Sequence, residues 1–251
     1  MEKNVILQIV GMGLTFFAGV VMPVIACMIL LKKKKDLWIL LSFICGGLIY
    51  AAFQIGIKMT GLNVLVQYKG FQRFMSEHYL WYCFLVGLVA AILALIGRLL
   101  LFFTIYKKKR TYEYALAVGL GYAMTEALYL VGISSITGIV QVINGNAVYA
   151  TSLTRELYLA AYERILLIII QTALTVLLVY FIKQKIVGFG IFISLLFSTF
   201  LEFLPSFFLY LSTKAMYEIY SREIGLVFVY ITLTATGIFG FTVMSYLKRK
   251  I

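Results

Sequence analysis

Long apolar runs recur along the whole chain, and they limit its fold more than any other feature of the sequence. Each run reaches about 20 residues or more, enough for a helix to cross the hydrocarbon core of a bilayer. Because lipid offers the backbone no hydrogen-bond partners, such runs fold as helices, and they are too long and continuous for barrel strands. The sequence therefore predicts an all-α, polytopic membrane bundle with about seven transmembrane helices. The runs are Val5–Leu31, Leu37–Ile57, Leu80–Tyr106, Tyr112–Ser134, Leu157–Ile182, Ile186–Leu211 and Ile224–Leu247.

Some stretches depart from this regular pattern. Lys58–Tyr79 is more polar and alternates apolar with polar residues, which favours an amphipathic segment lying on the membrane surface. Ile136–Ile143 either continues the fourth run or lies on the surface, and Asn144-Gly145-Asn146 then predicts a turn. Pro205 predicts an interruption of the sixth run, because proline has no backbone N–H to donate.

Short basic clusters follow the first, third, fifth and seventh runs, which is one side of the membrane throughout. Positive-inside sorting places that side in the cytoplasm, so we expect the amino terminus outside and the carboxyl terminus inside. Sorting also explains the net charge of +12 without a nucleic-acid partner. We expect a single transmembrane domain, 1–251, in contact with the lipid of a cell membrane, the plasma membrane of a bacterium. The clusters are Lys32–Lys35, Lys107–Arg110, Lys183 with Lys185, and Lys248–Lys250.

Four ionisable residues lie at a similar depth inside the apolar runs. At about 1.5 Å per residue, Glu126 lies about 20 Å and Glu202 about 24 Å from the basic edges of their runs. Glu163 and Arg164 lie about 10 Å from the opposite edge, so all four fall in one layer in the outer half of the bilayer. Charges in lipid are costly, and they mark either a functional pocket or polar struts between helices. The sequence leaves both interpretations open.

Arg98 lies apart from this layer, near the inner end of the third run. Its long side chain can snorkel to the inner surface beside the following basic cluster.

The usual ligands of zinc are scarce in this sequence. The only histidine is His78, in a polar stretch, and the three cysteines Cys27, Cys45 and Cys83 lie in or beside the first three runs. Zinc sites rely on histidine and cysteine in most cases, so zinc is disfavoured and we expect no metal and no other cofactor. A metal at the acidic layer would be a hard cation with oxygen ligands. A serine nucleophile likewise lacks a histidine base within the membrane.

Several of these residues resemble the pattern of the YhfC family of intramembrane peptidases, distant relatives of the prenyl-protein CAAX endopeptidases. The resemblance covers most of the chain. It rests on Pro23 before a basic run, Gly47, Phe53-Gln54, Arg98 before a basic cluster, Gly119-Leu120-Gly121 with Glu126, Glu163-Arg164, and Glu202 before Pro205.

The chain departs from the family pattern at the positions that would handle protons or a metal. The resemblance implies a glutamate pair that activates water and three histidines. Those positions hold Ala94, Leu95, Tyr122, Gln171 and Ser198, whereas Arg98, Glu126, Glu163 and Arg164 persist. Together, depth and resemblance predict a polar cluster made of Arg98, Tyr122, Glu126, Glu163, Arg164, Gln171, Ser198 and Glu202.

Three functions are consistent with this pattern. The favoured one is a family member that has lost protease activity, a pseudoenzyme that binds a peptide, lipid or membrane partner in the former active-site cavity, as an immunity or regulatory protein. The first alternative is an active intramembrane protease with a carboxylate-based site at Glu126, Glu163 or Glu202, since burial raises a carboxylate's basicity. The second is a proton- or ion-coupled transporter, against which stands the lack of an inverted repeat in the sequence.

Overall fold

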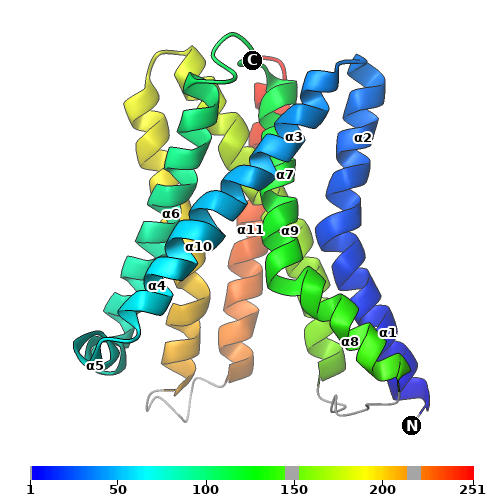
Figure 1. Ribbon diagram of the computed structural model, residues 1–251, viewed down its shortest axis with the longest axis vertical. Helices are drawn as coiled ribbons and strands as arrows, with labels where there is room; N and C mark the ends of the chain where they lie inside the picture. Colours follow the sequence, from blue (N-terminus) through cyan, green and yellow to red (C-terminus); the bar gives the residue numbers. More distant parts are fainter. Residues whose placement is uncertain (1, 145–152, 214–221) are drawn as a thin grey trace. The chain divides into compact units, whose positions relative to one another are not determined.

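The structure, a computed structural model, describes residues 2–144, 153–213 and 222–251. Within those residues seven helices are long and apolar enough to cross a membrane, and no strand is present. The prediction of an all-α polytopic bundle is therefore confirmed (Figure 1). The elements are α1 (Glu2–Phe16), η1 (Phe17–Val21), α2 (Met22–Lys34), α3 (Leu37–Tyr50), η2 (Ala51–Met59), α4 (Thr60–Leu65), α5 (Lys69–Glu77), α6 (Tyr79–Phe103), α7 (Tyr112–Ala127), η3 (Leu128–Gly132), α8 (Ile133–Ile143), α9 (Leu153–Lys183), α10 (Val187–Thr213) and α11 (Arg222–Leu247).

Three of the spans contain a π-helical segment, which widens the helix locally by shifting the backbone hydrogen bonds by one residue. The segment η1 joins α1 to α2, η2 joins α3 to α4, and η3 joins α7 to α8, each without a break in the helix. Such insertions are frequent at functional sites. The sequence carries no local signal that predicts them.

The chain forms two compact units. Unit 1 comprises Met1–Leu48 and Tyr112–Val176, and unit 2 comprises Ile49–Thr111 and Leu177–Ile251. The prediction of a single domain for 1–251 stays a prediction.

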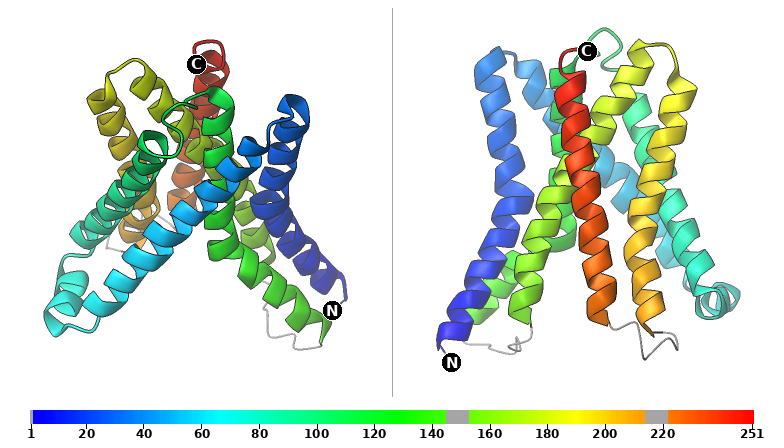
Figure 2. Two further views of the ribbon diagram at one scale, coloured as in Figure 1. Left: turned by 45° about the horizontal axis from the view of Figure 1, so that its top comes forward. Right: turned by 180° about the vertical axis from the view of Figure 1, so that it is seen from behind.

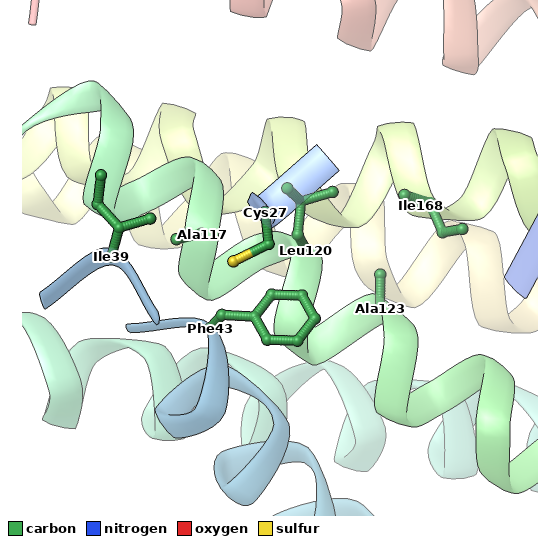
Figure 3. Close-up of a cluster of buried hydrophobic side chains, with 7 residues drawn as sticks. All are labelled: Cys27, Ile39, Phe43, Ala117, Leu120, Ala123 and Ile168. Carbon is green, nitrogen blue, oxygen red and sulfur yellow. The ribbon is translucent and has the colours of Figure 1, made fainter. Parts of the chain in front are cut away.

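In unit 1, α1 lies beside α8 and α2 lies beside α7 (Figures 1 and 2). The core between α2, α3, α7 and α9 is filled by small and aliphatic side chains around one aromatic ring. Figure 3 shows Phe43 of α3 beside Leu120 of α7 and Cys27 of α2. The buried cluster consists of Cys27, Ile39, Phe43, Ala117, Leu120, Ala123 and Ile168.

At one end of unit 1, residues at the end of the first span contact residues at the start of the fourth. Lys35 ends α2 in a left-handed conformation (φ 53°), and its N–H donates to the Leu31 carbonyl at 2.7 Å. Lys34 Nζ lies 2.6 Å from the Glu113 carboxylate, and the Tyr114 hydroxyl donates to Asp36. The first basic cluster and the start of α7 therefore share one membrane face.

In unit 2, α6 packs along α10, and α10 packs against α11. The short helix α5 lies across the end of α6 (Figure 2). Lys183 Nζ at the end of α9 donates to the Ile251 carbonyl at 2.7 Å, so the fifth- and seventh-span basic clusters share a face of this unit. The in/out orientation of the termini stays a prediction.

The helix boundaries bear on two of these predictions, and a third lies mostly outside the described residues. The second span continues through Lys58 to Leu65, so only α5 is a separate surface helix of the predicted Lys58–Tyr79 segment. The fourth span continues as η3 and α8 to Ile143, which settles the two alternatives for Ile136–Ile143. Of the predicted turn at 144–146, only Asn144 belongs to the described residues.

The predicted interruption at Pro205 is wrong, because α10 runs through this residue from Val187 to Thr213. Proline removes one backbone donor and leaves the carbonyl four residues earlier without its usual partner. Membrane helices tolerate this loss where neighbouring groups or a local adjustment satisfy the freed carbonyl.

Candidate functional site

Two glycines let α7 pack closely on two neighbours in unit 1. A Cβ at Gly119 would lie 2.7 Å from the Cα of Thr172 on α9, and a Cβ at Gly121 would lie 1.8 Å from the Phe43 carbonyl oxygen on α3. Two residues turn a helix by about 200°, so these glycines face opposite sides of α7. The Gly-x-Gly pair therefore permits close contact of α7 with both α3 and α9.

This packing places two of the predicted cluster residues deep in unit 1. Tyr122 follows Gly121 on α7 and is 2% exposed. Gln171 of α9 is half-buried and precedes Thr172, which contacts Gly119. Tyr122 therefore lies next to the contact of α7 with α3, and Gln171 lies next to the contact of α7 with α9.

A second close contact joins η1, α7 and α9 beside charged residues of unit 1. A Cβ at Gly19 of η1 would lie 2.9 Å from the Ala127 Cβ on α7 and 3.6 Å from the Arg164 Cγ on α9. Glu126 precedes Ala127 and is 7% exposed, as is Arg164. Ala127, the neighbour of Glu126, and Arg164 therefore meet at the π-helical segment η1. The common level of the four charged residues stays a prediction.

Arg164 and Glu163 form an ion pair that runs from the interior of unit 1 toward its surface. Arg164 Nη2 donates to the Glu163 carboxylate. The Glu163 side chain keeps 31% of its surface exposed, whereas the Arg164 side chain keeps 8%. Among the described residues, the buried Nε and Nη1 of Arg164 have no hydrogen-bond partner. A guanidinium has five N–H donors, so most of its donor capacity remains available here.

The remaining cluster residues belong to unit 2. Ser198 on α10 is half-buried and Glu202, one turn later, is exposed. The Glu202 Cβ lies 3.2 Å from a Cβ built at Gly87 on α6, which brings the two helices together. Arg98 lies eleven residues beyond Gly87 on α6, about 16 Å along the helix. Arg98 and Glu202 therefore occupy different levels of unit 2.

Arg98 is 1% exposed, so the alternative that its side chain snorkels to the inner surface is wrong. The neighbouring Gly97 explains the burial. A Cβ at Gly97 would lie 2.4 Å from Ile49 Cγ2 and 3.2 Å from Phe53 Cδ2, so the end of α3 and η2 cross directly over α6 at this point. Next to Phe53 in η2, Gln54 Nε2 donates to the Ala90 carbonyl of α6 at 2.8 Å.

The available donors do not fit a zinc site. No three His, Cys, Asp or Glu side chains of the described residues group closely enough to hold a metal ion. His78, the one histidine of the sequence, is exposed between α5 and α6. Cys27 lies in the apolar core of unit 1, and Cys83 is buried in α6 of unit 2. We therefore derive no chemical step through a metal.

A sequence model of the family described as YhfC intramembrane metalloprotease matches residues 19–150, about half of the chain. The match contains Arg98, Tyr122 and Glu126 of the predicted cluster and ends before Glu163, Arg164, Gln171, Ser198 and Glu202. No curated protein and no solved structure matches the chain.

Proposed function

Because the chain belongs to the YhfC intramembrane metalloprotease family, we propose that it binds a hydrophobic peptide or transmembrane segment without cleaving it. Its role is that of a regulatory or immunity protein of a bacterial plasma membrane. The binding site lies in unit 1, around the paired Glu163 and Arg164 and the neighbouring Glu126.

The observation that carries this proposal is the buried guanidinium of Arg164. Only its Nη2 donates to a partner that the structure identifies, Glu163, while its Nε and Nη1 have none among the described residues. Unpaired donors away from water cost free energy, and lipid cannot satisfy them. A peptide supplies backbone carbonyl and carboxylate oxygens, which are the acceptors that a guanidinium prefers.

The ion pair also gives a path to this site. Glu163 is about one-third exposed and lies next to Arg164 on α9. A ligand that approaches Glu163 from outside unit 1 can exchange places with its carboxylate on the guanidinium. The carboxylate would then turn toward the ligand's own N–H groups.

Loss of proteolysis is supported by the residues at the positions where the family pattern has its glutamate pair and its histidines. Ala94 and Leu95 are buried apolar residues of α6, which cannot accept a proton from water. Tyr122 is 2% exposed within unit 1, and its phenol is a poor base for accepting a proton from water. The carboxylate of Glu163 is engaged by Arg164, so a water molecule would have to compete for it.

The test uses the full chain in nanodiscs with single-span model peptides that carry either a free or an amidated C-terminus. We expect no cleavage, with or without added Zn²⁺, and at least tenfold weaker peptide binding for Arg164→Gln, about 1.4 kcal/mol. Arg155→Gln is the matched control, since Arg155 lies exposed on the same helix. It should bind like the wild type.

Three results would overturn the proposal. Cleavage that disappears with Glu126→Gln or Glu163→Gln would establish an active carboxylate-based protease. Proton-driven uptake into liposomes that depends on the same glutamates would establish a transporter. Equal peptide binding by wild type and Arg164→Gln, in variants whose helical content is unchanged, would remove the assigned site.

A further inference from the structure

Unit 2 contains an apolar cavity that the proposed function does not use. Its volume is about 330 Å³, and it lies between the end of the second span, α5 and the first half of α6. Leu62 and Leu65 of α4, Phe71 and Phe74 of α5, and Val89 and Leu93 of α6 belong to its lining. Figures 1 and 2 show these three helices together at one end of unit 2.

The surface helix α5 closes one side of this cavity. Phe71 of α5 packs edge-to-face on Tyr82 of α6, with ring centroids 5.8 Å apart. Gln72 Nε2 donates to the Val66 carbonyl at 2.7 Å and fixes the turn between α4 and α5. The outward face of α5 carries the Arg73–Glu77 ion pair at 2.7 Å. This amphipathic helix therefore lies with its apolar side toward the cavity and its polar side outward, as interfacial helices do.

The cavity opens toward the surroundings of the spans. Leu65, Leu85 and Val89 belong to its lining and yet are 44%, 44% and 46% exposed. In a membrane-spanning chain, surfaces of this kind face lipid. An occupant can therefore enter from the bilayer.

We infer that this cavity holds one acyl chain of a membrane phospholipid with an anionic headgroup. Lys58 is the only charged residue among the described residues that line the cavity, and its long side chain can reach the headgroup level to meet a phosphate. A volume near 330 Å³ is at the low end for ligand pockets and suits a slender chain.

A peptide fits the same cavity poorly. A helix is about 10 Å wide with its side chains, too wide for this space. An extended peptide would bring backbone N–H and C=O groups that need partners, and an almost wholly apolar lining supplies few. An acyl chain has no polar groups that need hydrogen-bond partners.

The test measures lipid binding by the delipidated full chain in detergent with native mass spectrometry. The probes are phosphatidylglycerol and phosphatidylcholine with the same oleoyl chains. We expect one phosphatidylglycerol to be retained per protein, at least tenfold more strongly than phosphatidylcholine. Lys58→Gln should bind both lipids equally, whereas Lys69→Gln, an exposed lysine of α5 outside the lining, should keep the preference.

Two variants fill the cavity. Apart from the neighbouring backbone of its own helix, no atom of the described residues lies within 4 Å of a Cβ built at Gly61, which belongs to the lining. Gly61→Trp therefore adds bulk there without a backbone clash. Val89→Trp fills the cavity from α6. Both should lose retained lipid at least tenfold. Gly188→Trp is the matched control, since Gly188 on α10 is equally open and lies outside the cavity.

Wild-type lipid retention by both filled variants, with helical content confirmed by circular dichroism, would overturn the inference. So would equal retention of the two lipids by the wild type. The same applies if lipid retention is unchanged in Gly61→Trp while crosslinking of a hydrophobic peptide to this cavity is lost, because a peptide would then be the occupant.

Discussion

Gly121 in unit 1 and Gly61 in unit 2 serve opposite purposes. A Cβ at Gly121 would lie 1.8 Å from the Phe43 carbonyl oxygen, whereas a Cβ at Gly61 would meet no described atom within 4 Å. The first glycine lets two backbones touch, and the second leaves space at a cavity wall. Unit 1 therefore packs backbone against backbone at this point, while unit 2 leaves an apolar surface open to lipid.

Among the substitutions considered for the two units, Gly121→Ala should destabilise the protein most. The added methyl group must push α3 from α7, because the obstacle is backbone and not a flexible side chain. We expect a loss of at least about 3 kcal/mol of unfolding free energy, the upper end of ordinary overpacking. Denaturant unfolding in detergent micelles measures it.

Gly13→Ala is the matched control for Gly121→Ala. Gly13 lies on α1 of the same unit, and a Cβ there meets no described atom within 4 Å. It should be as stable as the wild type or slightly more so. Equal stability of Gly121→Ala and Gly13→Ala would refute the close packing of α3 on α7.

Loss of the Glu163–Arg164 ion pair in unit 1 should cause the next largest decrease in unfolding free energy. Glu163→Gln removes the carboxylate that pairs with the buried Arg164, and leaves its charge without compensation. We expect a loss of about 2 kcal/mol, since one partner remains partly exposed. The same unfolding measurement applies.

A double-mutant cycle sharpens this prediction. Glu163→Gln with Arg164→Gln should be less destabilised than the sum of the two single variants, because the second change removes the unpaired charge. Strict additivity would show that the two side chains do not stabilise one another.

Most of the fold could be predicted because its signals are local. Span length and hydropathy depend only on neighbouring residues, so the seven helices follow from the apolar runs. The continuity of α10 through Pro205 could not be predicted in this way, because it depends on how surrounding groups satisfy a freed carbonyl. The same holds for the π-helical segments, whose extra residue has no signature in an apolar run.

The site could be predicted only in part. Depth along a helix follows from a fixed rise per residue, so the sequence predicts one level for Glu126 and Arg164. In the structure, Arg164 and Ala127, the neighbour of Glu126, both lie close to Gly19 of η1. Gly19 itself was missed, because a small residue in an apolar run is indistinguishable from ordinary packing. For Arg98 the sequence allowed both a place in the polar cluster and a side chain that snorkels. Its burial depends on α3 and η2 crossing α6 at Gly97, which is a tertiary contact.

At the open glycine of unit 2, a substitution should change stability only slightly. Gly61→Ala places a methyl group on α4 where no described atom lies within 4 Å, so it meets no steric obstacle. Alanine restricts the unfolded chain and favours the helix, which should raise the unfolding free energy by about 0.5–1 kcal/mol. A methyl group is also too small to displace an acyl chain, so lipid retention should stay at the wild-type level. A loss of stability comparable to that of Gly121→Ala would mean that Gly61 packs as tightly as Gly121, and unit 2 would then have no open wall at this point.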